Sequence, residues 1–287
     1  MREGTVFFKS GTMGFYKRYK KHQSKLKIIR YLEKDTTYDT AEKEMILHFL
    51  KNNPLDVFPY DFIRKYNPEN ILVYSDKEKG LKYVLHEDKR LYFKRKWSEK
   101  KIKGSYSRLL MEQDPESPHR YETPDFYVQE GEVVADAGVA EGNFALSIVE
   151  KVKKLYLFEV DEEWLEALDA TFAPWKEKVV IVHKYVSDKN DDKQVKLDDF
   201  FKDETIDFLK ADIEGAEVQM LDGCQALLSV KHPLKIIVCA YHKPNDADIL
   251  NRMLTEKGFQ TEFSKGYMIF KRKQSPYLRK GLIRGRK

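Results

Sequence analysis

The segment with the most specific chemistry in this sequence is Asp136-Ala-Gly138-Val-Ala140-Glu-Gly142-Asn143, which follows an apolar run and opens a helical pattern. Glycines at such a strand-to-helix turn let the backbone approach a ligand closely, and the first turn of the helix offers unpaired N–H donors. The segment therefore predicts a loop that binds a nucleotide-like cofactor. Tight turns of this kind also use glycine for purely structural reasons, so the loop needs support from other residues.

That support comes from Glu159, which ends the next β-type run, KLYLFEV, 21 residues after Gly138. An acid at this position can accept hydrogen bonds from both ribose hydroxyls of a bound nucleoside. The G-x-x-x-G spacing of the loop departs from the G-x-G-x-x-G spacing of dinucleotide-binding loops, and Asp136 precedes it. Acids repel a pyrophosphate but attract a sulfonium that carries an ammonium group. The pattern thus favours S-adenosylmethionine, with NAD as the alternative.

Further polar residues stand where other strands of the same sheet are expected to end. They are Asp188 in YVSDKN, Asp212 and Glu214 in LKADIEGAE, and His242 with Asp246 in AYHKPND. Because the carboxyl ends of parallel strands meet at one edge of a sheet, we expect these side chains to surround a single crevice. Asp246 also fits the ordinary structural use of an acid as a helix N-cap.

His242 is the predicted general base. An imidazole titrates near neutrality and could take the proton of an acceptor hydroxyl, while Asp212 and Glu214 position the reacting groups. The alternative is a strand-end histidine that only caps backbone groups. The same three residues could hold a divalent metal that acidifies the hydroxyl. Ligands separated by whole strands make a weak metal pattern, so we assign no metal ligand.

From Glu132 onward, apolar β-type runs alternate with amphipathic helical ones. This alternation predicts an α/β fold with a mostly parallel sheet covered by helices. The last pair of runs, QTEFSK and YMIFKRK, is separated by Lys265-Gly266 and predicts a C-terminal β-hairpin. We therefore predict a cofactor-binding domain over residues 126–273, followed by a basic tail over residues 274–287.

Residues 1–125 predict a small α+β cap or substrate-recognition domain. A helical face spans residues 41–51, and three β-rich runs at 70–75, 81–85 and 90–97 predict a meander. The cap ends in the polar, proline-bearing segment EQDPESPHRYETPD. We expect the cap and this segment to close over the pocket.

Composition bounds the setting of the protein. The chain has 287 residues, a net charge of +5 and two cysteines, Cys224 and Cys239, which lie in apolar periodic segments and predict buried thiols in a reducing compartment. No apolar run approaches the roughly 18 residues of a membrane helix, and the N-terminus has no signal-peptide core, so we expect a cytoplasmic protein. Residues 2–34 and 271–287 each carry a net charge of +8. These ends predict solvated tails, or a peripheral contact with an anionic membrane or a phosphorylated glycan.

Four segments together resemble the FkbM family of methyltransferases: DAGVAEGNFALS, LYLFEVDEE, VKLDDF and IDFLKADIEGAEVQMLDG. The resemblance covers roughly residues 130–245, and KADIEGAEVQMLDG is its most specific part. It implies a Rossmann-like class I methyltransferase fold with a mostly parallel seven-stranded sheet. It also implies an S-adenosylmethionine-dependent O-methyltransferase that acts on hydroxyls of sugars or natural products.

The resemblance assigns roles to residues by matching position. In the first loop, Ala140-Glu141 stands in place of the family's usual asparagine, so the contacts there differ from the family pattern. Asp212 would sit beside the sulfonium. The implied cofactor contacts are Asp136, Gly138, Ala140, Gly142 and Asn143 for the methionine part, Glu159 and Val160 for the ribose, and Ser187 and Asp188 for the adenine edge.

Three other function classes remain open at this stage. An NAD-dependent oxidoreductase shares the fold but predicts the other glycine spacing. A nucleic-acid methyltransferase would suit the basic ends, yet the chain has no proline-cysteine nucleophile and no Asn/Asp-Pro-Pro-aromatic pocket, so we expect a saccharide or other small-molecule hydroxyl as acceptor rather than nucleic acid. A non-enzymatic binding module would keep the loop and lack a base.

Overall fold

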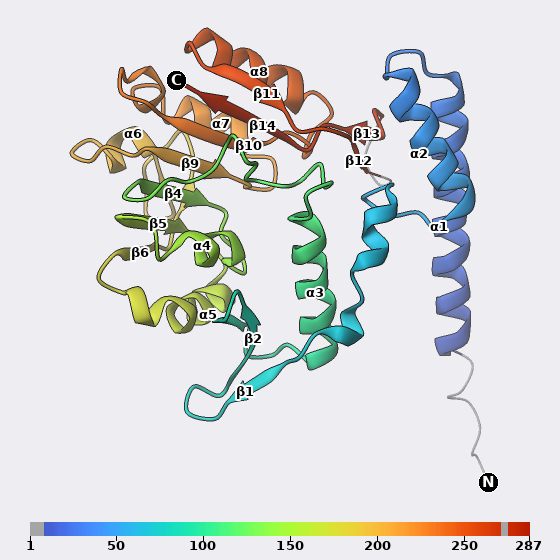
Figure 1. Ribbon diagram of the computed structural model, residues 1–287, viewed down its shortest axis with the longest axis horizontal. Coiled ribbons are helices and arrows are strands. Elements are labelled where there is room, and N and C mark those ends of the chain that lie inside the picture. Colours follow the sequence, from blue (N-terminus) through green and yellow to red (C-terminus); the bar gives the residue numbers. More distant parts are fainter. Residues whose placement is uncertain (1–8, 271–274) are drawn as a thin grey trace.

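A computed structural model describes residues 9–270 and 275–287 of the chain. A seven-stranded sheet forms its centre, in the order β11-β14-β10-β9-β4-β5-β6 (Figure 1). The neighbours from β10 to β6 are parallel, whereas β14 runs antiparallel to both β10 and β11. This confirms the predicted α/β class with a mostly parallel sheet. The strands are β4 (Val133–Ala137), β5 (Lys154–Phe158), β6 (Val179–Val182), β9 (Phe208–Ala211), β10 (Lys235–Cys239), β11 (Gln260–Phe263) and β14 (Leu282–Arg286).

Helices cover both faces of this sheet, which explains why strand β4, VVADA, is buried at all five positions. One hydrophobic core joins the sheet to α4 and α5, and a second joins it to α6, α7 and α8. The bounds of these helices are Asn143–Ile148 for α4, Glu162–Phe172 for α5, Leu197–Phe200 for α6, Glu217–Asp222 for α7 and Asp246–Glu256 for α8. Short elements complete this part: η3 (Ala173–Trp175), η4 (Leu227–Ser229), and the pair β7 (Tyr185–Val186) and β8 (Gln194–Val195).

The predicted meander and the predicted helix 41–51 are both present. The meander consists of β1 (Tyr74–Asp76), β2 (Leu81–His86) and β3 (Lys89–Phe93), and the helix is α2 (Thr40–Asn52), which is capped by Asp39. Two helices escaped prediction, α1 (Lys9–Lys34) and α3 (Glu99–Glu112). Between them lie η1 (Asp61–Lys65) and η2 (Pro68–Asn70).

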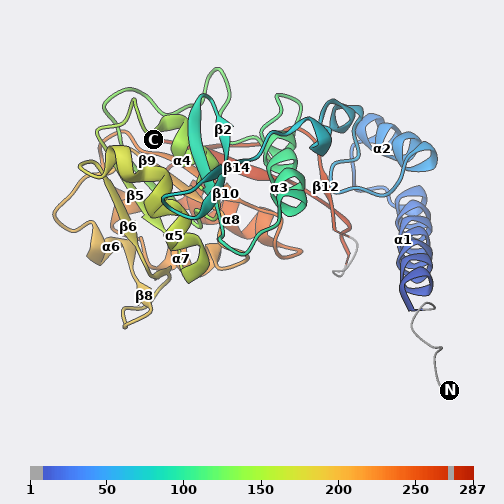
Figure 2. The same ribbon diagram turned by 90° about the horizontal axis from the view of Figure 1, so that it is seen from below.

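The described residues up to 125 contribute to three separate cores rather than forming one cap, the smallest of which joins Phe58 and Phe62 to Met268. The meander and α3 pack into the same core as α4 and α5. Helices α1 and α2 instead pack against a small antiparallel pair, β12 (Met268–Ile269) and β13 (Leu278–Arg279). Both views show α1 and α2 at the edge of the molecule, on the far side of α3 from the main sheet (Figures 1 and 2).

The predicted C-terminal hairpin and tail are wrong in their strand assignment. The antiparallel partner of β11 is β14, not the run YMIFKRK; Met268 and Ile269 of that run form β12, and its last three residues lie outside the described part of the chain. Residues 274–287 were predicted as a solvated tail, yet β14 stands between β10 and β11 and is buried from Leu282 to Gly285.

Two basic residues of this C-terminal segment, Arg279 and Arg284, are buried, and backbone carbonyls accept hydrogen bonds from both. Arg284 donates from Nε to the carbonyl of Tyr121 at 2.9 Å and also donates to the carbonyl of Arg120. Arg279 donates from Nη1 to the carbonyls of Tyr241 at 2.9 Å and His242 at 3.0 Å. The C-terminal segment therefore holds both the 112–125 segment and the end of β10 in place.

Cys224 and Cys239 are free and buried, as predicted. Among the described residues, no helix has the length and apolarity that crossing a membrane would require.

Candidate active site

The glycine-rich loop between β4 and α4 lies directly on the end of β9. Gly138 has φ +76°, and a Cβ added there would stand 1.9 Å from the carbonyl oxygen of Asp212, so only glycine fits. Ala140 also has a positive φ, +47°, and Gly142 follows at +80°. The loop is thus held in a left-handed path that places its backbone beside Asp212.

Glu159 fixes the far side of this loop. Its carboxylate accepts hydrogen bonds from the backbone N–H of Ala140 at 2.8 Å, Val160 at 2.7 Å and Asp161 at 2.8 Å. The side chain is 7% exposed. The predicted ribose acid therefore stands at the end of β5 and joins the β4–α4 loop to the β5–α5 turn.

A cavity of about 360 Å³ opens between these segments. Six of the residues predicted from the sequence line it: Gly138, Ala140, Glu159, Val160, Asp212 and Glu214. Asp136 lies beneath the loop, while Gly142 and Asn143 begin α4. Ser187 and Asp188 are not among the lining residues, which come instead from the adjacent Lys184, Tyr185 and Val186. Sequence reasoning also missed Trp164, an aromatic wall of the cavity.

Asp136 forms a buried ion pair with Lys210, whose Nζ lies 2.8 Å from its Oδ1. The same ammonium donates to the carbonyl of Gly138 at 2.8 Å. Burial alone would lower the pKa of Lys210, but the carboxylates of Asp136 and Asp212 outweigh it and raise that pKa. Lys210 is therefore a fixed cation that ties β9 to the glycine-rich loop. It stands two residues before Asp212 in LKADIEG, a signal that sequence reasoning passed over.

Asp212, at the end of β9, is the centre of a hydrogen-bonded group. Its Oδ2 accepts from the hydroxyl of Tyr121 at 2.9 Å, and its Oδ1 accepts from the hydroxyl of Tyr241 at 3.0 Å. Nε2 of His119 and Nε2 of His242 each lie 3.5 Å from one of its oxygens. We call these five residues the Asp212 cluster.

The Asp212 carboxyl stays ionised within this cluster. Burial favours its neutral form, but His119, Lys210 and His242 together hold its pKa well below the usual range. Its side chain is 19% exposed and faces the cavity. The cluster thus presents a fixed negative charge to whatever occupies the cavity.

His242 stands between acids at the end of β10. Its Nδ1 lies 2.8 Å from Oε1 of the buried Glu217, and its Nε2 faces Asp212 and, at 3.7 Å, Glu214. Burial would lower the pKa of His242, but Glu217, Asp212 and Glu214 reverse that effect and raise it. Glu217 orients the ring so that Nε2 points toward Asp212, an arrangement that suits a base whose tautomer is fixed by a carboxylate.

The three predicted catalytic residues differ in their surroundings. Asp212 and His242 are brought together, whereas the side chain of Glu214 is 95% exposed and its backbone has φ +54°. Glu217 is buried instead, and its carboxylate accepts from the N–H of Ile213 at 3.1 Å and of Gly215 at 3.3 Å. Asp246 was expected as a helix N-cap, but the N-cap of α8 is Asn245; Asp246 is the first residue of the helix and accepts from the N–H of Lys243 at 2.6 Å.

Sequence reasoning missed Tyr241, which directly precedes His242. It also missed His119 and Tyr121. They come from the segment EQDPESPHRYETPD, whose composition is that of an exposed linker, yet both are buried. The segment contacts Asp212 through these two residues, but none of residues 112–125 lines the cavity, so its closure over the pocket stays a prediction. A histidine and a tyrosine two residues apart between prolines were the only signal available.

Acids surround this site on several sides. Burial raises the pKa of Glu112, at the end of α3, and of Glu141, in the glycine-rich loop. These two acids therefore ionise less readily than exposed ones, and Asp136 is paired with Lys210, so the negative charge that the structure fixes here is that of Asp212. Such surroundings favour a cationic ligand over a pyrophosphate.

Comparison with known proteins gives one family match. The family described as the methyltransferase FkbM domain matches residues 184–261, which confirms the resemblance found in the sequence. No curated protein matches the chain.

Several solved structures are similar in fold. The methyltransferase FkbM from Methylobacillus flagellatus KT has 17% identity and a TM-score of 0.46, covering 66% of this chain and 54% of its own. A rRNA methylase from Streptococcus thermophilus has 17% identity and a TM-score of 0.39, covering 56% and 89%. The tRNA m1G37 methyltransferase of M. jannaschii has 13% identity and a TM-score of 0.42, covering 74% and 57%. This chain spans about half the length of the first and third of these proteins.

Proposed function

We propose that this chain is an S-adenosylmethionine-dependent methyltransferase that transfers the methyl group to a hydroxyl of a saccharide or saccharide-like acceptor. The match of residues 184–261 to the methyltransferase FkbM domain supports this proposal. The observation that carries the proposal is the position of Asp212. It lines the cofactor cavity with one side and holds the Asp212 cluster with the other. An acceptor hydroxyl that replaced a tyrosine hydroxyl on this carboxylate would be aligned toward the cavity.

The residues of the cavity fit S-adenosylmethionine, which supplies an electrophilic methyl group on a sulfonium when it is bound. Glu159 offers carboxylate oxygens at the position expected to meet ribose hydroxyls, and Trp164 and Val186 offer apolar walls. Asp212 supplies negative charge on the side of the glycine-rich loop. Asp136, which is paired with Lys210, remains a proposed contact for the methionine part. Ser187 and Asp188 remain proposed contacts for the adenine edge.

We assign proton removal to His242. In its neutral form, with the proton on Nδ1 facing Glu217, the lone pair of Nε2 faces the oxygens of Asp212. A hydroxyl held on Asp212 would be within reach of this lone pair, and positioning would supply much of the remaining rate. Glu214, on the exposed rim, would orient the acceptor rather than take its proton.

The experiment for the cofactor is a thermal-shift screen with S-adenosylmethionine, S-adenosylhomocysteine, NAD and NADP. A ligand that binds only the native state raises the melting temperature, so we expect a rise with the first two alone. A rise with NAD alone would overturn the assignment of the cavity.

The experiment for the acceptor is transfer of a labelled methyl group to a panel of free sugars, glycosides and polyphenols, with transfer RNA as the comparison. We expect label on a hydroxyl of the small acceptors. Label on RNA alone would replace the proposed acceptor class with nucleic acid.

We also propose a peripheral contact of the basic ends with an anionic membrane or phosphorylated glycan, carried mainly by α1, although Arg286 and Lys287 at the other end are exposed as well. The C-terminal cations Arg279 and Arg284 are buried and bonded within the fold. On α1, Lys21, Lys27 and Arg30 are exposed and could meet a phosphate-bearing surface. Vesicle binding that falls with salt and with reversal of these three charges would support it.

A further inference from the structure

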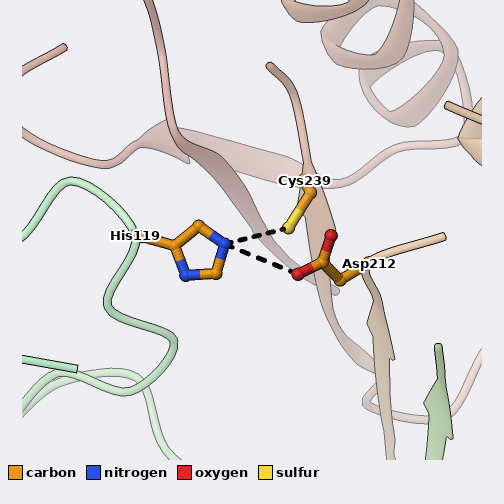
Figure 3. A group of neighbouring side chains, drawn as sticks. All are labelled: His119, Asp212 and Cys239. Atoms are coloured by element: carbon orange, nitrogen blue, oxygen red, sulfur yellow. Dashed lines mark hydrogen bonds and ion pairs between the residues drawn. The ribbon is translucent and has the colours of Figure 1, made fainter. Parts of the chain in front are cut away.

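Three side chains of different chemistry converge behind the cofactor cavity: His119, Asp212 and Cys239 (Figure 3). Nε2 of His119 lies 3.5 Å from Oδ2 of Asp212 and 3.9 Å from Sγ of Cys239. The ligand atoms of all three lie within 4.8 Å of one another. They come from three places in the chain: the 112–125 segment, the end of β9 and the end of β10.

An imidazole nitrogen, a carboxylate oxygen and a thiol sulfur form a donor set that suits Zn²⁺, Co²⁺ or Fe²⁺ rather than Mg²⁺ or Ca²⁺. With bond lengths of about 2.0–2.3 Å, neighbouring ligand atoms of a tetrahedral site lie about 3.3–3.7 Å apart. The spacings of 3.5 Å and 3.9 Å differ little from that range. His119 and Cys239 are 3% and 0% exposed, so this is not a chance cluster of surface acids.

The outer contacts are those of a metal site as well. The hydroxyls of Tyr121 and Tyr241 hydrogen-bond to the two oxygens of Asp212, and outer partners of this kind orient ligating carboxylates. Nδ1 of His119, in contrast, is buried and has no hydrogen-bond partner among the described residues. A histidine that lacks this outer bond holds a metal less tightly, so we expect a weaker site than a structural zinc site.

A second trio, Asp212, Glu217 and His242, has a similar spacing, but its members already make other hydrogen bonds. Glu217 already accepts two backbone N–H groups and lies 2.8 Å from His242, so its oxygens are engaged in holding the 213–217 turn. A cation there would displace these contacts. In the first trio a cation would displace only the 3.1 Å contact between Nε2 of His119 and the hydroxyl of Tyr241, and no backbone hydrogen bond of a turn.

We propose that His119, Asp212 and Cys239 form a three-ligand site for a transition-metal ion of the Zn²⁺ class, with a fourth position open. Asp212 would be shared between this ion and the cofactor cavity. The thiol of Cys239 would bind as thiolate and release its proton to solvent. The site goes beyond the proposed methyl transfer, because it stands on ligand geometry and not on the identity of the acceptor.

The test uses Co²⁺ as a spectroscopic probe on protein purified in chelator. We expect about one Co²⁺ per chain and the near-ultraviolet charge-transfer band of a cobalt–thiolate bond. Cys239→Ala should abolish the band, and His119→Ala should weaken Co²⁺ binding by more than about tenfold. Cys224→Ala is the matched control, because it removes the other buried free cysteine and should leave the band unchanged.

Folding and cofactor binding are followed separately, by thermal melting and by calorimetry with S-adenosylhomocysteine in chelator. If Cys239→Ala fails to fold, His119→Ala still decides the question. A wild-type protein without the band, a stoichiometry far below one, or a band that survives in Cys239→Ala would overturn the site. Loss of S-adenosylhomocysteine binding with an intact band would overturn the proposed function and leave the metal site standing.

Discussion

The cofactor cavity and the Asp212 cluster share one carboxylate but are assembled in different ways. The predicted part of the cavity is lined by segments that each directly follow a strand, so Gly138, Glu159 and Asp212 meet because their strands are neighbours in the sheet. The cluster adds His119 and Tyr121, which follow no strand of the sheet. Their segment is held by Arg284 of β14, some 160 residues away in sequence, and by the contact of Gly281 with Pro118, where an added Cβ would stand 1.9 Å from a carbonyl oxygen.

The ends of neighbouring strands are therefore sufficient to form the cofactor cavity, whereas the Asp212 cluster also needs β14, which is distant in sequence. If this is correct, changes in the C-terminal segment should disturb the cluster. Changes at strand ends should instead act on the cavity. The predictions below separate the two.

Deletion of residues 275–287 should have the largest effect. It removes β13 and β14, so β10 and β11 each lose an antiparallel partner, and the carbonyls of Tyr121 and Tyr241 lose their arginine donors. We expect no cooperative thermal unfolding by circular dichroism and no binding of S-adenosylhomocysteine. A truncated chain that melts like the full chain would show that these residues are a dispensable tail after all.

Replacement of His242 by alanine should lower turnover by a factor of roughly 10²–10⁴, the range for loss of a general base, with little change in cofactor affinity. The wild-type rate needs neutral His242, so it should fall as pH drops through the pKa of that group. Because the surrounding carboxylates raise this pKa, the midpoint should lie above 6.5, the ordinary value for histidine. A variant with full activity and a flat acid limb would leave positioning at Asp212 as the better account.

Replacement of Glu159 by alanine should act on the cavity alone. It removes the proposed partner of the ribose hydroxyls and frees three backbone N–H groups, so S-adenosylhomocysteine binding should weaken by about 2–3 kcal/mol. Calorimetry measures this, with Glu163→Ala as control, since Glu163 lies four residues later, in the first turn of α5, and is paired with Lys96 on the surface. An unchanged dissociation constant in a folded Glu159 variant would remove this residue from the site.

Replacement of Arg284 by methionine should have the smallest effect, and it should act on the Asp212 cluster rather than on the cofactor cavity. In this variant two backbone carbonyls of the 112–125 segment lose a buried donor. We expect the free energy of unfolding, measured by denaturant titration, to fall by about 1–3 kcal/mol. Cofactor affinity should stay close to that of the wild type. Arg286→Met, on the exposed end of the same strand, should change neither quantity. Equal losses in the two variants would mean that the buried arginine has no special role.

The sequence by itself determined the parallel sheet and its cofactor edge. Apolar runs that alternate with helical ones indicate strands buried on both faces of a sheet. This pattern predicted β4, β5, β9 and β10. It also predicted the loop at Gly138 and the acids Glu159 and Asp212. It also gave the meander, because alternation and turn residues are local signals. The family resemblance identified the cofactor as S-adenosylmethionine. Local patterns favoured this cofactor over NAD but did not decide between the two.

Only the tertiary structure decided where the charged and proline-rich segments go. Residues 282–286 carry two arginines and look solvated, yet Arg284 is buried because backbone carbonyls of a distant segment accept its donors. His119 and Tyr121 sit in a segment with the composition of a linker, and Asp212 with its neighbours makes them part of the site. The physical reason is the same in both cases. A polar group can be buried only where hydrogen-bond partners lie beside it in the folded chain. Here those partners are too distant in sequence for a local pattern to predict them.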